Sequence, residues 1–465
     1  MKFFKNLLRS SENEADSESN DQSKSQSTPK KAESEPVKAP RKKAPQAKPV
    51  AKPRVNAKGY FATLELPEAL DHAIGELGFS DCTAVQKEVL PHSIDGKDII
   101  AQAQTGTGKT AAFLISIITY HLENPEVEKR KAGTPFALVI APTRELVMQI
   151  TQDAEDLAKF CDFSSIAVVG GIDYEKQKNQ LKNPIDLVVA TPGRLLDFMR
   201  SGVVDLSQVE TLVIDEADRM LSMGFIPDVK DIIRRMPKKE NRQTQLFSAT
   251  FSDDIKRLAS SWTLDPVRIE IEPEKIAVDS VKQEVYLTAA DQKITVLYNL
   301  IHQEGVGKVM IFVNRRDQTR RVESQLHRYG IDCGLLTGEV PQKKRIQTLD
   351  RFKSGELRVL VATDVAGRGI HVDDVTHVVN YNLPEDPEDY VHRIGRTGRA
   401  GAKGTSISLA CEDDAFMLPS IETLLGVPMV CEQTPANLLT PLPAPTRSAR
   451  EHKPSPKPRD KRRGR

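Results

Sequence analysis

The middle of the chain alternates short apolar runs with longer segments in which apolar residues have helical spacing. Each run is strand-sized and rich in Val, Ile, Leu and Ala, and the segments between runs are long enough for a helix. This alternation predicts βαβ units, and therefore a parallel sheet with helices on both faces. The first series of runs covers residues 98–101, 137–141, 165–169, 187–190, 211–214 and 244–247.

A second series of runs begins after Pro266. Because it repeats the same alternation, it predicts a second α/β domain, joined to the first near residues 271–281. A helix is also expected before the first series, ending at Gly78. Its apolar positions are Leu64, Leu66, Leu70, Ile74 and Leu77. The runs of the second series cover residues 308–313, 333–336, 359–362, 377–381 and 405–409.

The flanks of this α/β region have a different composition. Residues 10–58 are rich in Ser, Glu, Lys, Pro and Ala and hold almost no large apolar side chain, so burial cannot offset the entropy of ordering them. The chain becomes Pro-rich and then basic after Cys431. We therefore expect a disordered arm at 1–58, a first domain at 59–270, a linker at 271–282, a second domain at 283–440 and a basic disordered tail at 441–465.

Charge is unevenly distributed, although the formal net charge is only +1. Residues 1–58 contain 14 Lys and Arg against 7 Asp and Glu, and residues 446–465 contain 9 against 2. Each end is therefore +7, which leaves −13 for the segment between them. Basic tails attract phosphate through counterion release without reading sequence, whereas an acidic core needs a local groove to bind a polyanion. The alternative for the tails is that they are soluble linkers.

Cysteine usage and hydropathy exclude several classes of protein. The cysteines are odd in number, are scattered and have no Cys-x-x-Cys spacing, which indicates reduced thiols and neither a disulfide framework nor a structural zinc site. No apolar stretch is long enough to span a bilayer, and the N-terminal apolar run is too short for a signal peptide. We expect a cytoplasmic protein. The cysteines are Cys82, Cys161, Cys333, Cys411 and Cys431.

The first apolar run leads into a Gly-rich segment and then an apolar helix, the context of a phosphate-binding loop. Gly106 and Gly108 allow the tight turns, and the backbone amides and the helix N-terminus face the phosphates. Lys109 is expected to reach the outer phosphates of ATP, and Thr110 to hold Mg²⁺. Ala103 departs from the common pattern, which has Gly there. The predicted nucleotide-binding residues of the loop are Ala103, Gln104, Thr105, Gly106, Thr107, Gly108, Lys109 and Thr110.

Two acidic residues follow the run at 211–214, where ligands bind in open parallel sheets. Asp215 is expected to bind Mg²⁺, and Glu216 to orient and deprotonate the attacking water. The structural alternative is an acidic turn that caps the next helix. Together with Lys109, these residues indicate a phosphate-loop ATPase.

Asp215, Glu216, Ala217 and Asp218 spell the box that names the DEAD-box RNA helicases, and the chain resembles that family across its whole folded region. The resemblance implies two RecA-like domains that close on ATP and RNA. It implies that Asp218 couples the nucleotide state to RNA binding through Ser248 and Thr250. The segment 78–86 resembles the adenine-recognition motif of the family, with Gln86 contacting the base and Phe61 stacking on it; Cys82 stands where Pro is usual.

The remaining motifs of the family follow in order. Small residues and helix starts let backbone amides approach a phosphodiester chain, and arginines supply charge. In the second domain, Arg396 and Arg399 resemble the arginine fingers that cross to the γ-phosphate, so hydrolysis would require domain closure. The predicted RNA-binding residues are Pro142, Thr143, Arg144, Gly170, Gly171, Thr191, Pro192, Gly193, Arg194, Gln342, Arg345 and Thr363.

Some positions depart from the family pattern. His371 stands where an Asp that contacts the ATP ribose is usual, with Asp373 or Asp374 as substitutes. These features and residues 406–426 resemble one branch, the helicases of bacterial RNA-degrading assemblies. That branch implies an endoribonuclease partner, and a monomer outside the complex. The segment 406–425 either docks that partner or is only a strand and a closing helix.

Two other functions fit parts of the pattern. An ATP-gated RNA clamp or scaffold would use the same motifs with little net strand separation. A DNA translocase or an unrelated phosphate-loop enzyme would explain Lys109 and Asp215, but not the RNA-facing series.

Overall fold

The computed structural model describes residues 56–103, 106–125, 130–271, 281–367, 372, 374–398 and 403–445. Several predictions fall outside this set, namely most of the arm and of the linker, the tail from residue 446, Gln104, Thr105, His371, Asp373 and Arg399.

The fold begins with a short 3₁₀ helix and two α-helices. These are η1 (Gly59–Thr63), α2 (Glu68–Glu76) and α3 (Ala84–Ile94). The predicted first helix is therefore wrong at its start, because Pro67 occupies the N-cap position of α2 and leaves Leu64 and Leu66 outside the helix. Gly78, with φ of +76°, follows the end of α2 as expected.

A seven-stranded parallel sheet forms the core of the first domain. The strand order is β3-β4-β2-β5-β6-β1-β7. Strands β2, β4 and β5 in the middle are buried on both faces, which explains their continuous apolar runs. The strands are β1 (Ile99–Gln102), β2 (Ala137–Ile140), β3 (Ser165–Val168), β4 (Leu187–Ala190), β5 (Thr211–Ile214), β6 (Gln243–Ser248) and β7 (Val267–Glu270).

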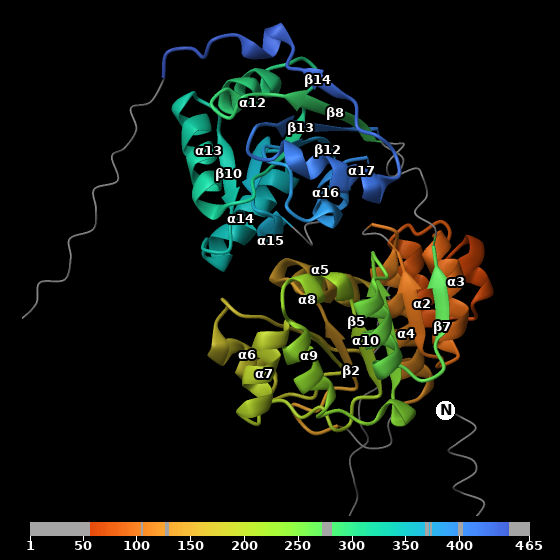
Figure 1. Cartoon of the computed structure of the whole chain (residues 1–465). Coiled ribbons are helices and arrows are strands. Elements are labelled where there is room, and N and C mark those ends of the chain that lie inside the picture. Colours follow the sequence, from red (N-terminus) through yellow and green to blue (C-terminus); the bar gives the residue numbers. More distant parts are fainter. Residues whose placement is uncertain are drawn as a thin grey trace, which may run out of the picture. The chain divides into compact units, whose positions relative to one another are not determined.

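Helices cover both faces of this sheet (Figure 1). Helices α3, α4 and α5 contribute to one apolar cluster, and α7, α8, α9 and α10 to the other. The bounds are α4 (Lys109–Glu123), α5 (Arg144–Leu157), α6 (Tyr174–Gln180), α7 (Pro192–Arg200), α8 (Ala217–Ser222), α9 (Ile226–Ile233), η2 (Lys239–Asn241) and α10 (Asp253–Trp262).

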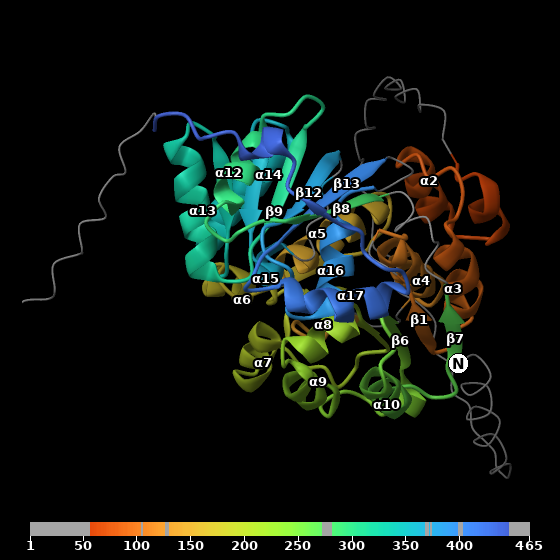
Figure 2. The ribbon, with the colours of Figure 1, turned by 45° about the horizontal axis from the view of Figure 1, so that its top comes forward.

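The second domain repeats the architecture with a seven-stranded parallel sheet of order β10-β11-β9-β12-β13-β8-β14. Strands β12, β13 and β8 lie side by side in Figure 2, as the register requires. The strands are β8 (Val281–Leu287), β9 (Lys308–Phe312), β10 (Cys333–Leu336), β11 (Val359–Ala362), β12 (Val375–Asn380), β13 (Gly404–Ala410) and β14 (Cys431–Gln433).

Helices α12 and α13 cover one face of the second sheet, and α14 to α17 the other. The two α/β domains confirm the predicted fold class. Among the described residues, no helix is long and apolar enough to cross a membrane. The bounds are α12 (Lys293–Ile301), α13 (Arg316–Arg328), α14 (Gln342–Lys353), α15 (Asp364–Gly367), α16 (Pro387–Ile394), η3 (Ala415–Met417), α17 (Leu418–Leu425) and η4 (Ala436–Leu439).

Candidate nucleotide and RNA site

The phosphate loop joins β1 to α4 at the carboxyl edge of the first sheet. Gly106 and Gly108 have φ of +87° and +92°, values that favour glycine over any other residue. Gly108 is the N-cap of α4, so the free amides of the first helical turn face the loop. Ala103, in place of the usual Gly, is buried and donates its backbone N–H to Ser248.

Gln86 holds the adenine-motif segment against this loop. Thr83 and Gln86 form a reciprocal capping box at the start of α3. The side-chain amide of Gln86 also donates to the carbonyl of Gly108 at 3.1 Å. A Cβ atom at Gly108 would lie 2.5 Å from Gln86 Nε2, so only glycine fits against this side chain.

Phe61, predicted to stack on the base, is only 1% exposed in the structure. Its ring packs 6.0 Å from the ring of Phe79, between centroids. The half-buried neighbour Tyr60 instead lies beside Lys87. Stacking of Phe61 on adenine therefore stays a prediction, and it requires its covered ring to become accessible.

Lys109 and Asp215 face each other at the ends of α4 and β5. Lys109 Nζ lies 3.9 Å from Asp215 Oδ1, and both side chains are almost completely buried. Among the described residues, Lys109 Nζ has no hydrogen-bond partner. Burial raises the pKa of Asp215, and the positive charge of Lys109 opposes that shift. A buried ammonium without a hydrogen-bond acceptor fits a site that receives an anion.

Glu216 directly follows and adopts left-handed backbone geometry, with φ of +53° and ψ of 53°. Its side chain is buried, and no described residue hydrogen-bonds to its Oε2. Burial, then repulsion by Asp215, raises the pKa of its carboxyl group. A carboxyl group that is buried on a strained backbone with one oxygen not hydrogen-bonded lowers the stability of the fold. Residues of this kind are concentrated at functional sites.

Asp218 connects the box to the end of β6. Its Oδ2 accepts hydrogen bonds from the backbone amides of Ala249 and Thr250 at 3.0 and 3.1 Å. Its own amide donates to Ser248 Oγ at 3.2 Å. The predicted partners therefore lie together, and movement of this acidic turn is tied to movement of the Ser-Ala-Thr segment.

The second domain contains a buried arginine that the sequence analysis did not single out. Arg393 of α16 donates to both carboxylate oxygens of Asp364 at 2.6 and 2.7 Å. It also donates to Asn314 Oδ1 and to the carbonyl of Asn382, each at 2.6 Å. Arg393 is the first of three arginines in residues 392–399, and this pattern could have singled it out from the sequence. Only the fold shows that its side chain is buried inside the second domain.

Arg396 is also buried, and its Nε donates to the carbonyl of His392 at 3.0 Å. Its charge acts on Glu216 of the first domain, lowering the pKa of that carboxyl group against the dominant effect of burial. Arg219 of α8 forms an ion pair with Asp389 of α16. This pair is a second contact between the segment that follows β5 and the region of α16 and Arg396. The two predicted halves of the ATP site thus interact in this structure.

The predicted RNA residues of the first domain lie where helices begin. Thr143 caps α5, and its hydroxyl accepts from the amide of Leu146. The Arg144 guanidinium lies against Gly170 and Gly171, where a Cβ at Gly171 would come within 2.4 Å of it. Arg194 lies over the rings of Tyr174 and Phe198, while Gly193 is exposed. Pro192 starts α7, and Thr191 precedes it as the N-cap.

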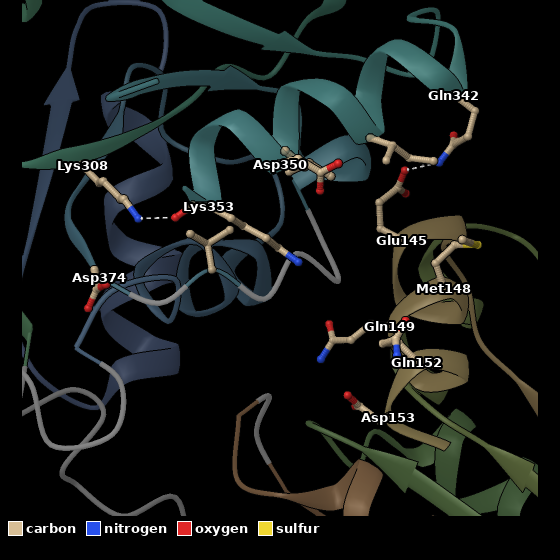
Figure 3. Close-up of a pocket in the computed structure, with 13 residues that line it drawn as sticks. Glu145, Met148, Gln149, Gln152, Asp153, Lys308, Gln342, Asp350, Lys353 and Asp374 are labelled. Carbon is tan, nitrogen blue, oxygen red and sulfur yellow. Dashed lines mark hydrogen bonds between the residues drawn. The ribbon is translucent and has the colours of Figure 1, made fainter. Parts of the chain in front are cut away.

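Glu145 connects the predicted RNA residues of the two domains, a role that the sequence analysis missed. It accepts from Gln342 Nε2 at 2.9 Å and pairs with Arg345 at 2.9 Å. Arg144 donates to Gln342 Oε1 at 3.5 Å. Thr363 is buried at the start of α15, where its carbonyl accepts from Ala366 and Gly367. Figure 3 shows Gln342 pointing toward Glu145 at one end of a cavity.

That cavity has a volume of about 580 Å³ and a mixed polar and apolar lining. Asp153 of α5 lies in it, and burial followed by repulsion from Asp156 raises the pKa of Asp153 to about 6. Lys353 of α14 opposes this shift. Asp374, one of the suggested substitutes at the ribose, lines the same cavity and is exposed.

Comparison with known proteins agrees with this arrangement. Residues 83–258 match the family DEAD/DEAH box helicase, and residues 292–401 match the helicase conserved C-terminal domain. The chain is 57% identical over 387 residues to the ATP-dependent RNA helicase RhlB of Pseudomonas aeruginosa, covering 83% of this chain and 98% of that protein. It is 44% identical over 394 residues to RhlB of Shewanella putrefaciens, covering 84% and 90%.

Solved structures with the same fold include Dbp5 of S. cerevisiae bound to RNA and ADP BeF3. That chain is 32% identical with a TM-score of 0.72, and the match covers 80% of this chain and 95% of that one. Mss116p bound to ssRNA and AMP-PNP is 28% identical with a TM-score of 0.73, covering 81% and 79%. The chain belongs to the RhlB family of DEAD-box ATP-dependent RNA helicases, enzymes that hydrolyse ATP.

Proposed function

We propose that this helicase uses RNA-stimulated ATP hydrolysis to separate structured RNA and so to assist a ribonuclease in RNA decay. The observation that carries the proposal is the buried group formed by Lys109, Asp215 and Glu216 beside Arg396. Each of these charges is expensive to bury; a bound nucleoside triphosphate would offset the cost for Lys109 and Arg396, and Mg²⁺ would offset it for Asp215.

ATP is proposed to bind with its phosphates against the amides of the loop and Lys109, and with its adenine edge against Gln86. Lys109 Nζ and Glu216 Oε2 are both buried with no hydrogen bond from the part of the chain that the structure describes, which supports a charged ligand here. Mg²⁺ fits the oxygen donors of Thr110 and Asp215, the ligand type that this ion prefers. It would neutralise charge on the phosphates.

In the proposed reaction Glu216 accepts the proton of the attacking water, and Arg396 and Arg399 stabilise charge that develops on the γ-phosphate. Asp218 transmits the nucleotide state to Ser248 and Thr250. The adjacent Glu145 contacts bring Arg144, Gln342 and Arg345 together, and these residues would hold the RNA backbone without reading bases.

Strand separation distinguishes this function from an ATP-gated clamp. The test is unwinding of a short RNA duplex with ATP and with a non-hydrolysable analogue. A helicase separates strands with ATP, while a clamp binds strongly in both conditions and separates little in either. A DNA translocase would be identified by equal stimulation of ATPase activity by DNA and RNA of the same sequence.

An endoribonuclease is the proposed partner, and the second domain offers a surface for it. Phe416, Leu424, Val427 and Val430 are large apolar residues around α17, with exposed fractions of 45% to 75%. Clustered exposed apolar side chains favour protein contacts. Figure 2 places α17 beside α16.

The partner proposal predicts that an endoribonuclease of the source cell copurifies with the wild-type chain. Phe416→Glu combined with Val430→Glu should abolish this association. Leu264→Glu, which changes a 47% exposed apolar residue of the first domain, is the matched control. Equal recovery of the nuclease with all three chains would contradict the assignment of this surface.

The C-terminal tail is proposed to add sequence-independent RNA affinity. Residues 446–465 are +7 overall, so their deletion should weaken binding and flatten its salt dependence. If the dependence of RNA affinity on salt concentration does not change, the tail acts as a linker or contacts a protein instead. We also propose a reducing, cytoplasmic location, from the scattered cysteines without Cys-x-x-Cys spacing, and a monomer outside the complex.

A further inference from the structure

We propose that an exposed basic surface of the second domain binds the phosphate backbone of RNA that continues beyond the predicted RNA residues. This basic surface consists of six cationic side chains at the starts of α13 and α14. The inference rests on the proposed function, because it extends the path of the same RNA. The six residues are Arg315, Arg316, Arg320, Arg321, Lys343 and Lys344.

The basic surface begins on α13. The buried side of this helix is formed by Thr319, Val322 and Leu326, which pack onto the sheet. The arginines occupy the other side, where Arg315 and Arg321 are 76% and 78% exposed. The sequence pattern of α13 therefore separates an apolar face from a face dense in guanidinium groups.

The basic surface continues onto α14 through the loop between β10 and α14. Glu339 of this loop pairs with both Arg316 and Arg320 of α13. Helices α13 and α14 both pack against β10, and both begin at the carboxyl edge of the sheet (Figure 1). The two helix starts are thus adjacent, although they lie on opposite faces of the sheet.

The first residues of α14 are divided between buried and solvent-exposed positions. Gln342 and Arg345, three residues apart on one side of the helix, are buried and contact Glu145. Lys343 and Lys344 lie between them in sequence and are exposed. An RNA backbone that continues from Gln342 and Arg345 toward the exposed side of the same helical turn would therefore reach two ammonium groups that face solvent.

Charge favours RNA as the occupant. Within the basic surface, Asp317 and Glu339 are the acidic partners of the arginines, so six cations and two anions leave a surplus of four positive charges. Exposed ion pairs of this kind stabilise a fold by only about 0 to 1 kcal/mol, so the arginines exchange partners readily. Guanidinium groups suit phosphate, and a local basic surface on an acidic core attracts a polyanion to that place.

The test measures binding of oligouridylates of increasing length to the full chain, with a non-hydrolysable ATP analogue present. The variant combines Arg320→Gln, Arg321→Gln, Lys343→Gln and Lys344→Gln. The control combines Arg234→Gln, Arg235→Gln, Lys256→Gln and Arg257→Gln, which removes the same charge from exposed residues at the C-cap of α9, directly after that cap, and in α10. Arg315 and Arg316 stay intact because they are next to Asn314, which Arg393 holds.

Wild-type affinity should keep rising with RNA length beyond the length that saturates ATPase stimulation. The basic-surface variant should lose roughly tenfold in affinity for long RNA at low salt, with a salt slope smaller by about 0.7 per lost contact. Its affinity for the shortest saturating RNA, and its ATPase stimulation by that RNA, should stay within about twofold. The control variant should match the wild type throughout.

Three results would overturn the inference. They are an equal loss in the control, an equal loss with short RNA, or no loss at all. None of these would affect the proposed function, which fails only if RNA does not stimulate ATP hydrolysis by the wild-type chain or strands are not separated.

Discussion

Individual buried charges carry most of the chemistry of this site. Lys109, Asp215 and Glu216 lie at the ends of α4 and β5, where the backbone can deliver them to one place. Their burial raises the pKa of both carboxyl groups, and Lys109 Nζ and Glu216 Oε2 have no hydrogen-bond partner within the described ranges. Such an arrangement is unfavourable for the empty domain, and it is explained if ATP completes it.

Two buried arginines of one helix region should differ in what their removal does. Arg393→Ala removes a buried guanidinium, leaves the half-buried Asp364 without its bidentate partner, and should destabilise the second domain by about 3 kcal/mol. Arg396→Ala should leave stability within about 1 kcal/mol and abolish turnover. Urea unfolding of both variants measures the contrast, and equal stability would refute the structural role of Arg393.

Asp153 should make stability depend on pH. Its pKa is raised from 3.8 to about 6 by burial, so the folded state binds the proton more tightly than the unfolded state. The stabilisation by the protonated form is complete below about pH 4 and is lost as the pH rises through about 6.

Asp153→Asn should therefore exceed the wild type by about 1 to 2 kcal/mol above about pH 7, after allowance for partial exposure, with the gain vanishing near about pH 4. Thermal unfolding across this range gives the measurement, and Asp162→Asn, at an exposed carboxyl, is the control. A gain that is independent of pH would exclude this cause.

At the residue scale, the sequence indicated the candidate site residues that belong to recognisable motifs. It did not indicate residues whose importance depends on the side chains that they contact in the folded chain. Lys109, Asp215 and Asp218 follow strands in recognisable motifs, and they lie where expected. Arg393 and Glu145 could not be assigned, because their partners come from distant strands or from the other domain. Phe61 resembled a stacking residue, but packing against Phe79 buries it.

At the scale of elements, loops that start helices set the geometry of the site. Gly108 ends the phosphate loop as the N-cap of α4, and α5, α7 and α14 begin at the predicted RNA residues. Helix starts present free amides, so the same local structure serves ATP phosphates in one place and RNA phosphates in another.

Gly108→Ala should disrupt the phosphate loop. The positive φ strains any other residue, and the added Cβ would collide with Gln86. We expect nucleotide affinity to fall by at least about tenfold, with a stability loss of about 1 to 3 kcal/mol. Fluorescent ATP-analogue binding provides the measurement. Gly193→Ala, which has open space around its Cβ, should bind nucleotide as the wild type does; equal losses in both would refute the steric argument.

The sequence predicted every strand of the described residues except β7, β8 and β14. Strands β2, β4 and β5 are buried on both faces and stand out as runs. Strand β8 mixes buried with polar positions, and β7 and β14 are edge strands with exposed side chains, so none has that signature. The range expected for the linker overlaps the first residues of β8 for the same reason.

At the scale of the whole molecule, the proposed catalytic groups are divided between two domains. Lys109 and Glu216 belong to the first and Arg396 to the second, and the charge of Arg396 reaches Glu216 in this structure. Glu145 links the predicted RNA residues across the same pair of domains. On the proposed roles, ATP and RNA would both favour the arrangement in which the domains meet, which would couple hydrolysis to RNA binding.

Steady-state ATP hydrolysis with and without RNA, for the wild type, Glu216→Gln and Arg396→Ala, tests this coupling most directly. We predict that RNA stimulates the wild type, and that each variant loses about 10³-fold or more of the stimulated rate, since one residue from each domain is needed. Both variants should still bind ATP. Full turnover in either variant, or a wild-type rate that RNA does not change, would contradict the account.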